Sequence, residues 1–171
     1  MNKALEIMKL MDEIEYGWVD KKNNRHIKLQ GFADNYMLQS PKELINSKLG
    51  VCWDQVELER FYFKERNIVV NSYFIVHYDD NKCPCHTFIS FEENNKFYWF
   101  EHAWKKHKGI KEFNTEKELL NEVKSKFIDM ELNNEYQENH LFIYQYEEPK
   151  IHIDVEEFYK HCEKGKKVKP E

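Results

Sequence analysis

The stretch Leu49-Gly50-Val51-Cys52-Trp53-Asp54-Gln55 decides how the rest of this 171-residue chain is interpreted. Gly50 allows the backbone to turn sharply, and the amphipathic pattern from Cys52 to about Arg66 predicts a helix. Cys52 therefore lies at a helix start, where unpaired N–H groups and the helix dipole stabilise a thiolate. A free cysteine in this position is either a nucleophile or a small core residue beneath the helix.

The segments on either side of this helix predict an α+β domain. Apolar residues recur at helical spacing over residues 2–15, and Ser40-Pro41 followed by Glu43 predicts a short helix that ends near Gly50. The pattern changes after Arg66 to β-branched and aromatic residues. It predicts strands over 68–78, 86–91, 96–102 and 141–146, and helices over 115–131 and 155–162. Helices followed by an antiparallel sheet with an inserted helix define the α+β class.

A tight hairpin is predicted at Asn94-Asn95, because asparagine tolerates the positive φ of such turns. If these two residues form the turn, the residue numbers of any two cross-strand partners sum to 189. Glu101 then lies opposite Phe88, two positions from His86. His86 and Glu101 are then diagonal neighbours on one face. That face carries His86, Phe88, Ser90, Phe97, Trp99 and Glu101. A sum of 187 would place His86 directly opposite Glu101, and a sum of 188 would place them on opposite faces.

Cys52, His86 and Glu101 have the residue types of a nucleophile, its general base and an orienting acid. A carboxylate bonded to imidazole holds one tautomer and stabilises the imidazolium, which in turn pairs with a thiolate. Each residue also has an ordinary interpretation. Cys52 is then a core side chain, His86 a solvated strand end and Glu101 a surface charge on an edge strand. Their joint spacing favours the catalytic interpretation.

Three motifs together resemble the transglutaminase-like superfamily, over roughly residues 35–115. They are the cysteine motif at 49–55, His86-Thr87-Phe88 at a strand start, and Tyr98-Trp99-Phe100-Glu101-His102-Ala103-Trp104. The resemblance implies a fold related to papain-like cysteine enzymes, with the nucleophile helix packed on an antiparallel sheet. It implies that Cys52 is the nucleophile, His86 the general base and acid, and Glu101 the orienting acid. Most members have aspartate where Glu101 stands.

The superfamily contains transglutaminases, peptidases, deamidases, glycan-removing amidases and inactive members. The resemblance therefore implies the type of reaction, which is acyl transfer through a thioester. It defines the substrate less well. We expect a protein or peptide that donates an amide. The alternative is an inactive domain that keeps the fold and binds peptides.

The implied oxyanion needs two hydrogen-bond donors, the N–H of Cys52 and one upstream side chain. The candidates for that side chain are Gln39, Tyr36 and Trp18. Gln39 resembles the glutamine that serves papain-like enzymes, although it lies farther from Cys52 along the chain, and it is otherwise a solvated loop residue. Trp53 follows the presumed nucleophile and is either core or a substrate contact.

The composition narrows the function classes. The 26 Lys and Arg against 31 Asp and Glu give a net charge of −5, which lacks the basic field that binds nucleic acids. No apolar run reaches the roughly 18 residues of a membrane helix, and the charged N-terminus is unlike a signal peptide. The four cysteines are too few for a disulfide scaffold, so we expect free thiols in a cytoplasmic protein without membrane or nucleic-acid partners.

We expect one domain over residues 1–171, with a core at about 35–148 and a frayed basic tail at about 163–171. Cys83-Pro84-Cys85-His86 invites a zinc interpretation, with other histidines completing the site. Zinc ligands usually come as C-x₂₋₄-C pairs with a second pair downstream. Because the spacing here is C-x-C and no second cysteine pair follows, we expect no metal and no cofactor.

Overall fold

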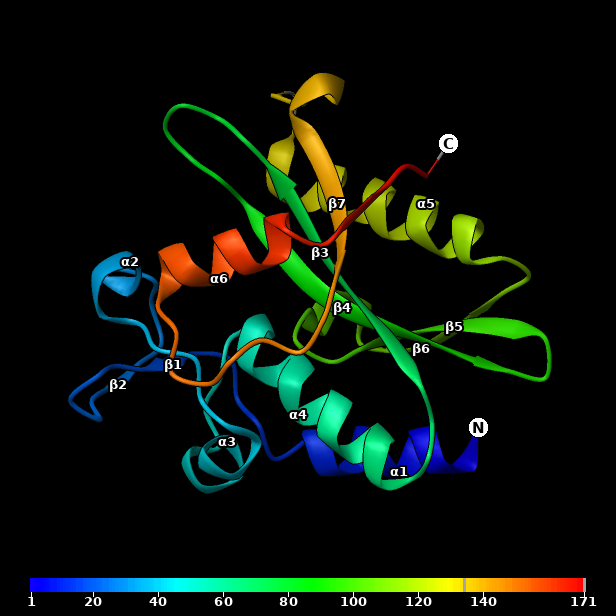
Figure 1. The fold of residues 1–171 in the computed structure, drawn as a ribbon, viewed down its shortest axis with the longest axis horizontal. Helices are drawn as coiled ribbons and strands as arrows, with labels where there is room; N and C mark the ends of the chain where they lie inside the picture. The colour runs from blue at the N-terminus through cyan, green and yellow to red at the C-terminus, as the bar shows by residue number, and fades with distance from the viewer. Residues whose placement is uncertain (134, 171) are drawn as a thin grey trace.

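The computed structural model describes residues 1–133 and 135–170, and its helices and strands form an α+β fold (Figure 1). The helices are α1 (Asn2–Met11), α2 (Phe32–Asn35), α3 (Pro41–Ser47), α4 (Cys52–Glu65), α5 (Glu116–Phe127) and α6 (Val155–Glu163). The strands are β1 (Trp18–Val19), β2 (Arg25–His26), β3 (Val70–His77), β4 (Cys85–Glu93), β5 (Lys96–Glu101), β6 (Gly109–Phe113), β7 (Leu141–Tyr146) and β8 (Lys166–Val168). The expected fold class is confirmed.

Strands β3 to β8 form one sheet in the order β6-β5-β4-β3-β7-β8, and every neighbouring pair in it is antiparallel. Strands β1 and β2 form a separate two-stranded sheet. Strand β4 has β3 on one side and β5 on the other, so it lies inside the sheet. This central strand carries His86.

The hairpin between β4 and β5 has the predicted geometry. Asn94 and Asn95 have positive φ angles of 54° and 59°, and Glu93 pairs with Lys96. Paired positions therefore sum to 189, which confirms the predicted register. The apolar side chains alternate accordingly between two clusters, one on each face of the sheet.

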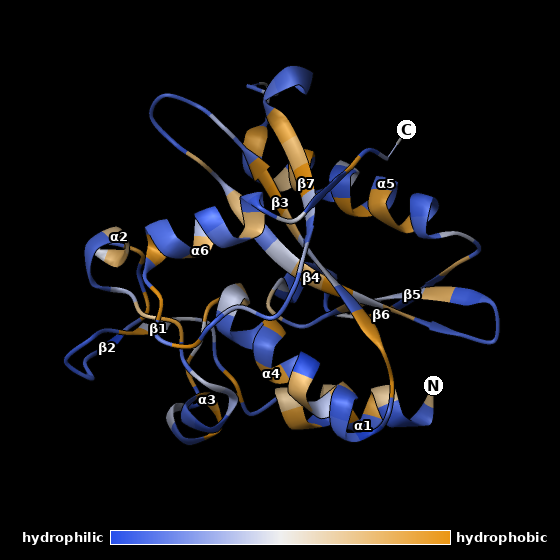
Figure 2. Cartoon of the chain, in the orientation of Figure 1, coloured by the Kyte–Doolittle hydropathy of each residue, from blue (hydrophilic) through white to orange (hydrophobic). Residues whose placement is uncertain are grey.

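Helices cover both faces of the sheet. On one face, α1, α4 and α6 pack against the strands, and the Phe63 ring of α4 lies 5.2 Å from the rings of Phe91 and of Phe100. On the other face, α5 covers Phe88 and Trp99. Figure 2 shows hydrophobic residues along β3 and β7, between these helices. This packing sets α4, which begins at Cys52, against one face of the antiparallel sheet.

The short helix α3 begins as its sequence predicts. The Ser40 hydroxyl accepts a hydrogen bond from the Glu43 N–H at 3.1 Å, and the Glu43 carboxylate accepts one from the Ser40 N–H at 3.2 Å. The helix ends within the predicted segment Lys48-Leu49-Gly50, at Lys48, which takes the left-handed conformation with φ of 58°. Gly50 belongs to the turn that leads into α4.

Two expectations at the ends of the chain were wrong. Helix α1 stops at Met11, four residues short of the predicted end. The basic tail is not frayed over its whole length, because Lys166, Lys167 and Val168 form β8 and pair with β7. Residues 166–168 satisfy the otherwise unpaired edge of β7, and the Lys167 ammonium lies 4.6 Å from the centre of the Phe142 ring.

Several further elements were not predicted, among them the short β1, β2 and α2 in a segment expected to be irregular. Strand β6 is short and carries charged residues, so its pattern is weak. The last turn of the predicted helix over 115–131 is a π-helix, Ile128–Leu132. Among the described residues, no helix has both the length and the apolar character that crossing a bilayer requires.

Candidate active site

Cys52 is the first residue of α4, as its sequence predicts, with Val51 as the N-cap. The N–H groups of the first helical turn have no acceptor within the helix and point toward the chain start. Only 4% of Cys52 is exposed. The turn before it is tight, because a Cβ on Gly50 would lie 2.7 Å from Cδ1 of Leu44 and 2.9 Å from Cβ of Asp54.

Asp54 holds this helix start in place. Its buried carboxylate accepts hydrogen bonds from the Val51 N–H at 3.1 Å, the Gln39 N–H at 2.9 Å and the Tyr36 hydroxyl at 2.9 Å. Burial raises the pKa of Asp54 to about 7, against the effect of these three donors. One carboxylate therefore joins the upstream segment to the start of α4.

His86 and Glu101 form the pair that the hairpin register predicts. The Nε2 atom of His86 lies 2.6 Å from Oε1 of Glu101, and both side chains are buried. The other Glu101 oxygen accepts from the Trp104 N–H at 3.1 Å. Burial acts to lower the pKa of His86, but the Glu101 charge and a hydrogen bond with Cys52 outweigh it and raise this pKa to about 10.

The imidazole of His86 is thus placed between the thiol and the carboxylate. Because its Nε2 faces Glu101, Nδ1 is the ring nitrogen left for Cys52. The register pairs β5 with β4 only as far as Ile89, opposite Phe100, so β5 does not flank the strand at His86. Because the edge of β4 is open at His86, α4 on one face of the sheet can approach the His86 side chain, which points to the other face.

Trp104 covers the imidazole. Its ring stacks on His86 with a centroid separation of 4.0 Å and an interplanar angle of 16°. The same residue therefore contacts both members of the pair, His86 through its ring and Glu101 through its backbone N–H. Trp104 belongs to the motif at residues 98–104, but its position on His86 was not predicted.

A second polar layer joins α4 to the end of β5. The Gln55 amide donates to the Gly50 carbonyl at 2.9 Å, and its oxygen lies 2.6 Å from Nδ1 of His102. Below it, Glu59 is a carboxyl group with 2% exposure, and burial followed by the nearby Glu101 charge raises its pKa well above the ordinary value. Glu59 was not among the predicted site residues. Its spacing of seven residues from Cys52 places it on the same face of the helix and could have indicated it.

The remaining cysteines have no such partners. Burial raises the pKa of Cys85 to about 12, and its sulfur accepts from the Tyr159 hydroxyl at 3.5 Å and from the Trp53 indole. Burial also raises the pKa of Cys162, while Cys83 is exposed. All four cysteines are unpaired. Within residues 1–133 and 135–170, no three histidine, cysteine or acidic side chains gather to hold a metal ion.

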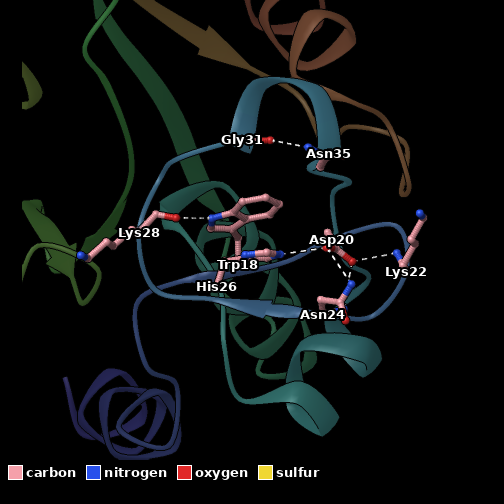
Figure 3. Close-up of polar contacts among 8 residues, drawn as sticks. All are labelled: Trp18, Asp20, Lys22, Asn24, His26, Lys28, Gly31 and Asn35. Atoms are coloured by element: carbon pink, nitrogen blue, oxygen red, sulfur yellow. Dashed lines mark hydrogen bonds and ion pairs between the residues drawn. The ribbon is translucent and has the colours of Figure 1, made fainter.

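The structure places the four accessory candidates around the helix start, with their polar atoms engaged. Trp18 donates its indole N–H to the Lys28 carbonyl at 2.8 Å (Figure 3). Tyr36 donates to Asp54. The Gln39 amide donates to the Leu49 carbonyl at 2.8 Å and accepts from the Ser47 hydroxyl at 2.7 Å. Trp53 stacks on Phe158 of α6 at 4.1 Å and donates to Cys85.

Tyr16 lies near the nucleophile and was not among the candidates. Burial, followed by the proximity of the Cys52 and Cys85 sulfurs, raises the pKa of Tyr16 far above 10. The sequence offered one signal: Tyr16 directly precedes Gly17, in a segment without helical or strand periodicity.

The family model of the transglutaminase-like domain matches residues 1–116. No curated protein matches the chain. The matched segment contains α4, β4 and β5, and thus Cys52, His86 and Glu101, and it ends at the first residue of α5, so β7, α6 and β8 lie beyond it. Because the match covers more than half of the 171 residues, the chain belongs to the transglutaminase-like domain family.

Proposed function

We propose that this protein is a cysteine-dependent acyl-transfer enzyme that cleaves or exchanges an amide or isopeptide bond. The observation that carries the proposal is the buried His86–Glu101 pair, with Nε2 2.6 Å from Oε1, next to Cys52 at the start of α4. A helix N-terminus and an imidazolium both stabilise a thiolate, and a buried carboxylate stabilises the imidazolium. The family match supports the same reaction type.

In the proposed reaction, the Cys52 thiolate attacks the carbonyl carbon of the amide. A C–S bond forms and the carbonyl electron pair moves to oxygen, where the Cys52 N–H is one donor for the developing charge. When the intermediate collapses, the C–N bond breaks and His86 gives its proton to the departing amine. Water or a second amine then attacks the thioester while His86 takes its proton, which releases the acyl product and restores the thiolate.

The proposed substrate is a protein or peptide. Because Cys52 is only 4% exposed, the reacting carbonyl belongs to a slender group, either a side-chain carboxamide or an extended peptide segment. The four unpaired cysteines are consistent with a reducing compartment, and we propose the cytoplasm.

Iodoacetamide labelling across pH, followed by mass spectrometry of the peptides, tests the proposal. Cys52 is expected to be alkylated faster, and at lower pH, than the exposed Cys83. Peptides that carry an electrophile should label the wild type and not Cys52→Ala, whose melting should stay cooperative. Equal and slow labelling of both cysteines contradicts the proposal.

One observation favours a different function. Cys52 belongs to the apolar cluster beneath α4, which suits a core cysteine in an inactive domain that binds peptides. In that case Cys52 should label more slowly than the exposed Cys83. Loss of cooperative melting in Cys52→Ala would also favour it.

A further inference from the structure

Tyr16 is held beside the turn that leads into the nucleophile helix. The Glu15 N–H donates to the Lys48 carbonyl at 2.9 Å, and the Gly50 N–H donates to the Glu15 carbonyl at 3.0 Å. The Gly17 N–H donates to the Gly50 carbonyl at 3.4 Å. Both neighbours of Tyr16 are therefore hydrogen-bonded to the segment that ends two residues before the nucleophile.

Gly17 makes this close approach possible. A Cβ at this position would lie 2.6 Å from the His26 carbonyl oxygen and 2.6 Å from Cδ1 of Leu49. Both distances are too short for any side chain, so the backbone of Tyr16 is confined between two segments.

The Tyr16 residue lies beside the turn that leads to Cys52, and its hydroxyl has a proton to donate. About a third of the residue is exposed (36%), which leaves one side open to a substrate. The largest cause of its raised pKa is burial, and the next is the Cys52 sulfur, so the hydroxyl lies within electrostatic range of that sulfur and stays protonated across the working pH range. In the part of the chain that the structure describes, no acceptor takes this hydroxyl's hydrogen.

The other upstream donors are occupied. The Trp18 indole, the Tyr36 hydroxyl and the Gln39 amide all donate to protein acceptors. Moving any of these donors to a substrate oxygen would break a buried hydrogen bond, which costs about 1–3 kcal/mol. Tyr16 has no such bond to lose.

We propose that Tyr16 is a catalytic residue whose phenolic O–H donates a hydrogen bond to the oxyanion formed when Cys52 attacks an amide carbonyl, opposite the donor supplied by the Cys52 N–H. This assignment rests on the proposed acyl-transfer function. Negative charge develops on the carbonyl oxygen as the C–S bond forms. The C=O double bond is restored when the C–N bond breaks. The Tyr16 proton stays on the phenol throughout, so this residue stabilises the intermediate without exchanging a proton.

Two reactions of Cys52 distinguish this role from a structural one. Acylation by p-nitrophenyl acetate passes through an oxyanion, whereas alkylation by iodoacetamide displaces iodide at a saturated carbon and forms none. In Tyr16→Phe, which keeps the ring, acylation is expected to slow by about 10²-fold, the effect of removing one oxyanion donor. Alkylation at the same pH is expected to keep its wild-type rate. Tyr62→Phe, a partly exposed tyrosine on α4, is the matched control and should change neither rate.

The possible outcomes separate the two proposals. If the wild type acylates at Cys52 and Tyr16→Phe does so equally fast, the role of Tyr16 is overturned while the acyl-transfer function stands. If acylation and alkylation slow together, Tyr16 positions the sulfur instead, which also overturns the assignment. If the wild type alkylates at Cys52 but no acyl donor reacts there, both proposals fail.

Discussion

The Nε2 atom of His86 lies 2.6 Å from Oε1 of Glu101, although the strand register sets these residues on a diagonal. Diagonal neighbours in an antiparallel pair are about 7–8 Å apart, a span that favours a long side chain. The extra methylene of glutamate, relative to the aspartate that most family members have, supplies this reach. The Trp104 N–H then holds the second carboxylate oxygen at 3.1 Å.

Glu101→Gln should lower the pKa of His86. The carboxylate is the largest cause that raises this pKa to about 10, and a close opposite charge contributes about 1–3 pH units. NMR titration of the imidazole ring measures the change. Glu92→Gln, at an exposed position of β4, is the control and should leave the titration unchanged. Glu101→Asp should give an intermediate pKa, because it keeps the charge but shortens the reach.

Protonated His86 should stabilise the fold in a pH-dependent way. Its pKa is raised from 6.5 when unfolded to about 10 when folded, so its contribution is complete below pH 6.5 and is lost as the pH rises toward 10. The free energy of unfolding of the wild type, relative to His86→Gln, should therefore fall by about 1.4 kcal/mol per pH unit in this window. Urea unfolding at pH 6, 8 and 10 measures it. A difference that stays constant with pH would show that the pair makes no charge-dependent contribution.

Glu59→Gln should stabilise the protein at alkaline pH. Burial raises the pKa of Glu59 well above 4.5, so the stability that its protonated form contributes is lost as the pH rises past 4.5. Glutamine has the same shape and cannot ionise. The free energies of unfolding of the variant and the wild type should match near pH 4. Above that pH, the difference in favour of the variant should grow by up to about 1.4 kcal/mol per pH unit until the pKa of Glu59 in the folded state is reached. Glu65→Gln, at the exposed end of α4, should show no such trend.

Asp54→Ala should destabilise the fold by about 3–5 kcal/mol. It leaves the Val51 N–H, the Gln39 N–H and the Tyr36 hydroxyl buried without an acceptor, and each such group costs about 1–3 kcal/mol. Urea unfolding measures the loss. Asp34→Ala, at an exposed position of α2, should cost much less. Equal effects at the two positions would show that Asp54 does not hold the helix start.

Trp104→Ala should slow acyl transfer, although the variant still has Cys52. Removing the ring uncovers the His86–Glu101 pair and deletes a cation–π contact worth about 0.5–2 kcal/mol. We expect a lower pKa for His86 and a lower kcat. Trp104→Phe keeps an aromatic face, so the pKa of His86 and kcat should both return most of the way to their wild-type values. If Trp104→Phe is as impaired as Trp104→Ala, stacking is not the cause.

Local patterns in the sequence determined the elements and the register around the site. Helical spacing after Gly50 placed Cys52 at a helix start, and two adjacent asparagines determined the hairpin turn. A two-residue turn leaves one register, and the alternation of side chains then puts His86 and Glu101 on one face. These features depend on interactions between residues close in the sequence, which is why they were predictable.

The tertiary structure alone decided which polar groups surround the sulfur. Tyr16 lies beside the turn before Cys52 because residues 15 and 17 bond to residues 48 and 50, and Glu59 is buried because α4 packs on β4 and β5. Trp18, Tyr36 and Gln39 had the right chemistry, but long-range packing gave their donors other acceptors. Competition for a hydrogen-bond partner depends on every group within about 3 Å in space. Spacing along a single chain does not contain that information.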